Sequence, residues 1–417
     1  MRKLKAVKLI ILLILIISLG GCWDKKEIEK NAFVVAIGMD KGTDNRISIT
    51  YLIANPNFFT QQQGGGNAVP REVITFEAND LISAKNLANT VIAKDISYDL
   101  LRYFIVSEKL AQEKDFIKWI YTTTKDREIR RDSYIIVVKE KASQFIKNND
   151  PKLETAPHKY FEQIIKRGSS IGLIPNSELH TFLRITEAEG DLFLAAYATT
   201  EHERADENNR NNGANFIAGE LFTKGETNQT QFLGSAVFKK GVMIGKLTGE
   251  ETRIYYLLNN LKTAPAMVTT ISDPINENES NALRIKKLKD NDVKLDFDRH
   301  GEGKITIKIP LIIDVLSDLS MENYSKNIKK RELLKKHIEE QLTKRFENFV
   351  KRTQTEFKGQ PFGWSLDARK KVLTIPEYKK INWMETYPDM EVLIAVDIKF
   401  GEFGRQSKLP NLKEIRD

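Results

Sequence analysis

The first residues constrain this chain more than any other part of the sequence. Four basic residues lie within the first eight positions, with no acidic residue among them, and an apolar stretch from Leu9 to Leu19 follows. This order of charge and hydrophobicity is typical of a secretory signal. A stretch of about a dozen residues is shorter than the roughly 20 that a helix needs to cross a bilayer. We therefore expect residues 1–21 to be a cleaved signal peptide and not a membrane-spanning anchor.

The apolar stretch ends in Leu19-Gly20-Gly21-Cys22, which resembles the lipobox of bacterial lipoproteins. Such a box allows the thiol to be diacylated before the peptide is cut on its N-terminal side. Cys22 is the only cysteine, so no internal disulfide can form, and acylation accounts for its presence. Two acyl chains anchor a protein stably where one does not. We predict lipid attachment at Cys22 and a position on the outer face of a membrane. The alternative is an ordinary signal peptide with a chance cysteine.

The charge of the chain does not indicate a nucleic-acid-binding protein. The formal net charge is +8 over 417 residues, and four of the positive charges belong to the predicted signal peptide. The remaining lysines and arginines are interspersed with acids, as in Lys289-Asp290-Asn291-Asp292, and no basic cluster alternates with aromatic residues. We expect a solvated surface of mixed charge and no nucleic-acid partner.

The mature chain alternates between strand and helix patterns. Two β-rich runs, 31–40 and 46–53, predict a hairpin, and helices and strands then alternate through residue 197. Thr248-Gly249-Glu250-Glu251 is a capping-box pattern that predicts a helix through Leu261. An apolar stripe containing Leu334 and Phe346 predicts a long amphipathic helix over 324–355, and 391–400 predicts a strand. The expected fold is a multi-domain mixed α/β or α+β structure, with mixed sheets packed with helices and no transmembrane helix in the mature chain.

The length predicts two or three domains, at about 150 residues each. The segment 206–213 is polar, ends in glycine and contains no apolar residue, so it is the best candidate for an interdomain linker. We expect an N-terminal α/β domain over 22–205. A middle domain over 206–280 would hold a hairpin and the capped helix, and a C-terminal domain over 281–417 would place the long helix on a sheet.

One motif raises the possibility of an enzyme. Gly168-Ser169-Ser170-Ile171-Gly172 satisfies the Gly-x-Ser-x-Gly pattern of hydrolase nucleophiles, but a nucleophile elbow follows a strand. Residues 160–167 read as a helix that enters a glycine stop, so the sequence favours a helix C-terminus. The five histidines show no metal-ligand spacing, and no phosphate-binding or calcium loop is present in the sequence. We predict no catalytic residue, no metal site and no cofactor.

Several segments carry a family resemblance. Cys22-Trp23-Asp24 and the run Ala36-Ile37-Gly38-Met39-Asp40 resemble the start of the Ger(x)C family, the C-subunit lipoproteins of bacterial spore germinant receptors. Further similarity lies in 102–108, 126–130 and 234–247, and in Gln360-Pro361-Phe362-Gly363-Trp364 with Trp383 downstream. The resemblance covers nearly the whole mature length, and the order of these segments is specific in combination.

The resemblance implies a non-enzymatic subunit that works with the integral-membrane A and B subunits of a germinant receptor in the spore inner membrane. No catalytic residue is carried over, because the family has none assigned. A lipid-anchored solute-binding protein of a transporter is the alternative, although the two halves of the chain share no visible repeat. Phe362 and Trp364 lie in a glycine- and proline-bearing segment outside the expected elements, so we predict that they dock a partner. The alternative is that both rings belong to the core of their own domain.

Overall fold

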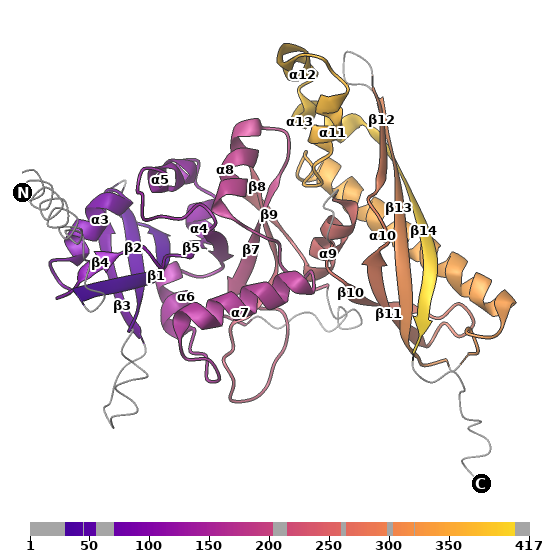
Figure 1. The fold of residues 1–417 in the computed structure, drawn as a ribbon, viewed down its shortest axis with the longest axis horizontal. Helices are drawn as coiled ribbons and strands as arrows, with labels where there is room; N and C mark the ends of the chain where they lie inside the picture. Colours follow the sequence, from indigo (N-terminus) through magenta and orange to yellow (C-terminus); the bar gives the residue numbers. More distant parts are fainter. Residues whose placement is uncertain are drawn as a thin grey trace, which may run out of the picture.

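The computed structural model describes residues 30–44, 46–55, 71–202, 215–259, 264–297, 303–320 and 322–404. These residues form two units, each built on one β-sheet, which lie side by side along the long axis of the molecule (Figure 1). In the described part of the chain, every helix is too short or too polar to cross a membrane. The predicted class, mixed sheets packed with helices, is confirmed.

The first unit is built on a nine-stranded sheet in the described residues, with the order β3-β2-β1-β5-β6-β7-β8-β9 and with β4 paired to β1. Its inner strands β1, β5, β6 and β7 run parallel, and antiparallel strands flank them on both sides. The strands are β1 (Asn31–Lys41), β2 (Ile47–Ala54), β3 (Arg71–Ala78), β4 (Asp95–Ser97), β5 (Tyr103–Ser107), β6 (Tyr134–Val138), β7 (Phe193–Thr199), β8 (Gln231–Lys239) and β9 (Val242–Leu247).

Helices cover both faces of this sheet, because parallel strands need crossover connections. Apolar residues of α6 and α7 pack on one face, and those of α3, α4, α5 and α8 pack on the other. The inner strands are therefore buried on both sides and consist almost wholly of apolar residues, as in β6. The helices are α3 (Leu81–Ala88), α4 (Glu108–Ala111), α5 (Phe116–Thr123), α6 (Ala142–Asn148), α7 (Pro157–Ser170) and α8 (Leu179–Ala188).

The second unit is a five-stranded sheet in the described residues, with the order β10-β11-β13-β12 and with β14 paired to β13. The chain leaves β13 through the long helix α10 and returns in β14, which runs parallel to β13 along most of its length. Its elements are β10 (Met267–Ser272), β11 (Ser280–Lys287), β12 (Asp292–Phe297), β13 (Gly303–Asp318), α10 (Ile328–Thr355), α11 (Trp364–Lys370), α12 (Ile375–Ile381), α13 (Trp383–Thr386), η3 (Tyr387–Asp389) and β14 (Glu391–Phe403).

Four local predictions are confirmed. The N-terminal hairpin forms as β1 and β2, and the last strand forms as β14. The apolar stripe of α10, which includes Leu334, Ile338, Leu342, Phe346 and Phe349, is buried. Helix α9 (Gly249–Leu258) begins at the predicted capping box, where Glu251 N donates to Thr248 Oγ1 at 3.2 Å and Thr248 N donates to Glu251 Oε2 at 2.9 Å.

The predicted middle domain, 206–280, is not a separate unit. Strands β8 and β9 extend the first sheet, because β8 pairs with β7 along most of its length. Strand β10 belongs to the second sheet instead, where it pairs with β11. The reason is that a two-stranded hairpin buries too little surface alone and gains by adding to a larger sheet. The proposed linker 206–213 lies outside the described residues.

Candidate functional site

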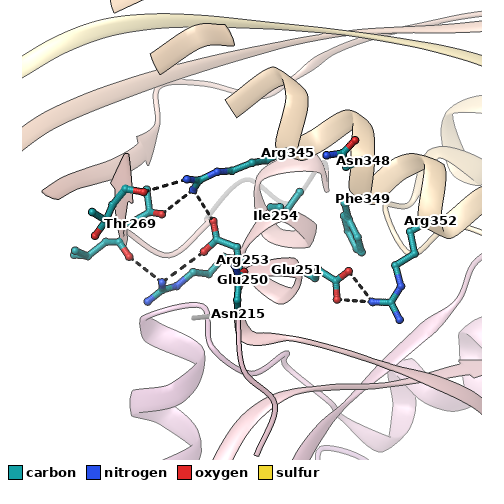
Figure 2. A pocket seen from close by; sticks show the side chains of 12 residues that line it. Asn215, Glu250, Glu251, Arg253, Ile254, Thr269, Arg345, Asn348, Phe349 and Arg352 are labelled. Atoms are coloured by element: carbon teal, nitrogen blue, oxygen red, sulfur yellow. Dashed lines mark hydrogen bonds and ion pairs between the residues drawn. The ribbon is translucent and has the colours of Figure 1, made fainter. Parts of the chain in front are cut away.

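The two units meet at a pocket of about 620 Å³ that contains an unusual number of charged side chains (Figure 2). It opens between α9, β10 and α10, so residues far apart in the sequence come together there. Two glutamates and three arginines are among the residues of its walls. The described residues that line it are Asn215, Glu250, Glu251, Arg253, Ile254, Val268, Thr269, Thr270, Arg345, Asn348, Phe349 and Arg352.

Local helix geometry positions these charges. Glu250 and Glu251 stand in the first turn of α9, where the positive end of the helix dipole favours acids. Arg345 and Arg352 lie seven residues apart on α10, which is about two turns, so they share one face of that helix. The two acids of α9 therefore face two bases of α10.

The first ion pair joins Glu250 to two arginines. Arg345 Nη1 lies 3.3 Å from Glu250 Oε1 and donates to Thr269 Oγ1 at 3.2 Å, and its Nη2 donates to the carbonyl of Thr270 at 3.1 Å. Arg253 Nη1 donates to the carbonyl of Val268 at 2.8 Å and lies 3.9 Å from Glu250 Oε2. Burial lowers the pKa of Arg253, and the nearby charge of Glu250 opposes this effect.

The second ion pair joins Arg352 to Glu251. Arg352 Nη1 donates to both carboxylate oxygens of Glu251 at 2.6 Å, and its Nη2 donates to the carbonyl of Lys246 at 3.1 Å. Glu356 accepts two more hydrogen bonds, from Nε at 2.6 Å and from Nη2 at 3.0 Å. Burial acts to lower the pKa of Arg352, but the bonds to Glu356 and Glu251 outweigh it and raise the pKa. Every nitrogen of this guanidinium is thus engaged within the protein.

The charged side chains of this pocket bind one another across two helices. Its described lining contains no serine, cysteine or histidine that a neighbouring base could activate as a nucleophile. The ion pairs connect α9, which follows the first sheet, to α10 of the second unit. We call this surface, formed by Glu250, Glu251, Arg345 and Arg352, the charged joint.

A second contact between the units lies at Asp191, in the loop before β7. Its Oδ2 accepts a hydrogen bond of 2.7 Å from Ser365 Oγ, and its Oδ1 accepts one from Gln360 Nε2. The backbone adds to it, because Leu192 N donates to the carbonyl of Gln360 at 2.9 Å. Burial raises the pKa of Asp191 to about 6, although the hydrogen bonds from Ser365 and Gln360 favour its ionised form. Gly190 fits closely beside it, since a Cβ there would lie 2.9 Å from the Cβ of Ser365.

The prediction that Phe362 and Trp364 are exposed docking residues is wrong. Both side chains have 0 % exposure, and their ring centroids lie 4.5 Å apart. Phe349 of α10 and Tyr387 of η3 surround them at 5.7 and 6.1 Å. Large apolar rings gain more by leaving water than a loop loses by becoming ordered, so the segment folds into the core of its own unit.

The serine motif ends a helix, as the sequence predicted. Ser169 and Ser170 belong to the last turn of α7, and Gly172 follows in the left-handed conformation with φ +74. Ser170 Oγ donates to the carbonyl of Arg167 at 2.8 Å, which is a local helix bond. The described histidines are scattered, and no group of three or more potential metal ligands occurs in the described ranges. Cys22, the predicted lipid site, and His300 lie outside the described residues.

Sequence reasoning missed the residues that join the units. Asp191 follows a glycine and precedes an apolar strand, a pattern that an ordinary surface turn shares. Arg345 and Arg352 stand among the many charges of the long helix. Their seven-residue spacing was the only available signal, and it is not specific, because solvated helix faces often show it.

Comparisons with known proteins identify two family domains in the chain, and the second of them begins within β8 of the first sheet. A model described as spore germination protein N-terminal domain matches residues 24–198, and a model described as spore germination B3/GerAC like, C-terminal, matches residues 233–404. Spore germination protein B3 of Bacillus subtilis (strain 168) is 22% identical over 97% of this chain and 99% of its own length. Spore germination protein KC of the same strain is 27% identical over 44% of this chain, and that match spans only 42% of the KC protein.

A solved structure shares the fold. The crystal structure of the GerBC protein aligns with a TM-score of 0.52 at 16% identity, covering 87% of this chain and 96% of that one. Because the identity is low, this likeness speaks for the fold alone. The two family models fall in order along one chain and between them cover most of the described residues. The chain therefore belongs to the Ger(x)C family of spore germination proteins.

Proposed function

We propose that this protein is the lipid-anchored C subunit of a nutrient germinant receptor in the spore inner membrane. It acts there without catalysis, together with two integral-membrane subunits, A and B, and is needed for the germination response. The observation that carries the proposal is the presence of both family domains, in order, on one chain. The relatives named above are spore germination proteins, which supports a role in the same process.

The charged joint and the contact at Asp191 support a structural role. In each of them the charged or polar groups bind one another, so their chemistry holds the units together instead of acting on a substrate. The two units also differ: the first has parallel inner strands, and the second is antiparallel apart from the pairing of β13 with β14. A solute-binding protein of the two-lobed type would have similar sheets on both sides of a cleft, so this difference favours the receptor subunit.

The proposed lipid on Cys22 would hold the protein at the membrane. Cys22 stands nine residues before Asn31, the first residue of β1, so this strand lies close along the chain to the proposed lipid. On this proposal the acylated sulfur holds the mature chain to the outer face of the membrane. Metabolic labelling with a fatty-acid analogue tests it, and Cys22→Ala should abolish the label and release the protein or leave it unprocessed. Ser170→Ala is the control and should remain labelled. A labelled Cys22→Ala variant would contradict the assignment.

The partners can be tested separately. A tagged copy of the protein, solubilised from spore membranes and captured, should bring down two integral-membrane proteins, and deletion of the gene should abolish the response to at least one nutrient. Recovery of the membrane components of a transporter, together with solute binding to the soluble mature chain by calorimetry, would establish the alternative function instead.

A further inference from the structure

The described chain begins at one end of the molecule. β1 starts beside β4, with Asn31 opposite Asp95, and the turn that connects α3 to β4 lies directly before this pairing. Asn89 connects the turn to β4, since its Oδ1 accepts a hydrogen bond of 2.9 Å from Ile96 N. Helix α3 and β4 lie at the end of the molecule farthest from the second sheet (Figure 1).

Two apolar side chains protrude at this end. The sequence places Leu87 and Val91 on the same helix face as Ala84 and Ala88, but the helix ends at Ala88 and only the alanines are buried. Leu87 is 46% exposed and Val91 is 72% exposed. The backbone that presents them is ordered, because Thr90 N donates to the carbonyl of Leu87 and Val91 N to that of Ala88, both at 3.1 Å. Single exposed apolar residues are common, so this feature alone indicates nothing.

The second observation is the short length of chain between Cys22 and β1. Eight residue steps separate Cys22 from Lys30, and a fully extended chain of that length spans at most about 29 Å. If Cys22 carries acyl chains, as the proposed function holds, the bilayer surface must pass within that distance of the start of β1. The end of the molecule that contains Leu87 and Val91 is therefore tethered close to the lipid, and the second unit is the more distant part.

We propose that Leu87, Val91 and Lys94 form a membrane-contact surface that rests on the bilayer. The two apolar side chains enter the boundary between headgroups and acyl chains, and Lys94, a partly buried residue three positions after Val91, supplies a positive charge for anionic headgroups. This contact fixes the orientation of a protein that a flexible tether alone would leave free to turn. It holds the second unit away from the bilayer. The inference rests on the lipid anchor of the proposed function.

The uniqueness of Cys22 makes a direct test possible. In the acylated protein its sulfur is blocked, so a cysteine introduced elsewhere is the only free thiol. Val91→Cys and, as the matched control, Leu373→Cys are each labelled with an environment-sensitive fluorophore on the acylated chain. Leu373 is 97% exposed and lies in the second unit, before α12. Both variants are reconstituted in vesicles of phosphatidylcholine and phosphatidylglycerol, with and without a lipid that carries a nitroxide quencher in its acyl chain.

The expected result is a large loss of fluorescence at position 91 and little loss at position 373. Equal quenching at the two positions, or stronger quenching at 373, would overturn the membrane-contact surface. Flotation of the same vesicles reports on the anchor by itself. If the protein floats with the vesicles but shows no quenching at position 91, the lipid anchor stands and the membrane-contact surface is wrong. If the protein does not float, both the anchor and the membrane-contact surface are wrong. Circular dichroism of each variant confirms that the exposed substitutions leave the fold unchanged.

Discussion

Asp191 accepts a hydrogen bond of 2.7 Å from the hydroxyl of Ser365, although 174 residues separate the two in sequence. The carboxylate belongs to the loop that enters β7 of the first sheet, and the serine lies in the first turn of α11 of the second unit. The bond therefore joins the two family domains through side chains, beside the backbone bond from Leu192 to Gln360. Relative movement of the units would have to break this contact and the charged joint together.

This contact predicts a pH dependence of stability. Burial raises the pKa of Asp191 to about 6, above the value near 4 of an unfolded aspartate. Between these values the folded protein binds a proton that the unfolded chain has released, so the free energy of unfolding falls as pH rises from about 4 to about 6. Above that window the effect is constant. Denaturant titrations of the soluble mature chain at several pH values measure it.

Asp191→Asn isolates this contribution. An amide cannot ionise, yet its oxygen can still accept from Ser365, so the variant should lose the part of the pH dependence that lies between about 4 and 6. At neutral pH the removal of a buried charge stabilises the variant, but the amide nitrogen of asparagine cannot accept the bond from Gln360 Nε2, so these two effects oppose each other. An unchanged pH profile would show that other groups produce it.

Phe362→Ala should destabilise the protein strongly. The ring is fully buried between Phe349 and Trp364, and truncation of a buried phenylalanine costs about 3–5 kcal/mol. Phe222→Ala is the matched control, since that ring is 69% exposed and its removal should change the free energy of unfolding by less than about 0.5 kcal/mol. Thermal and chemical unfolding measure both variants. Equal midpoints for the two variants would show that Phe362 is not part of the core.

The charged joint should show stronger coupling than a surface ion pair. In a double-mutant cycle, Arg352→Ala and Glu251→Ala should couple by about 1 kcal/mol or more, because Nη1 of Arg352 reaches both carboxylate oxygens of Glu251 and the pair is more than half buried. The exposed pair of Lys118 and Asp115, at 2.6 Å, is the control and should couple by about 0.5 kcal/mol or less. Similar coupling in the two cycles would mean that the joint adds nothing beyond a surface contact.

Two serine variants should differ in their effect on stability, because one hydroxyl is exposed at a helix end and the other is buried. Ser170→Ala removes an exposed helix-end bond and should leave both stability and germination unchanged. Ser235→Ala removes a buried hydroxyl that is 2.7 Å from Thr252 Oγ1, and it should cost about 0.5–1.5 kcal/mol, the net contribution of one hydrogen bond, because Thr252 Oγ1 keeps its bond to the carbonyl of Thr248. A folded and abundant Ser170→Ala protein that fails to support germination would revive the hydrolase hypothesis.

Features that depend on neighbouring residues could be predicted from the sequence. The capping box at Thr248, the apolar stripe of α10 and the glycine stop after Ser170 follow from bonds and spacings within a few residues, and the structure contains all three. The family resemblance rests on the same local segments. Lipid attachment at Cys22 stays a prediction, because that residue lies outside the described ranges.

Only the tertiary structure decided how distant segments share surfaces. The sequence could not show that β8 and β9 extend the first sheet, because strand pairing depends on which edge is available in space. It could not show that Phe362 is core while Val91 is exposed, since both are apolar and burial depends on what packs against them. Asp191 and Ser365 meet for the same reason: a hydrogen bond needs proximity in space, and separation along the chain carries no information about it.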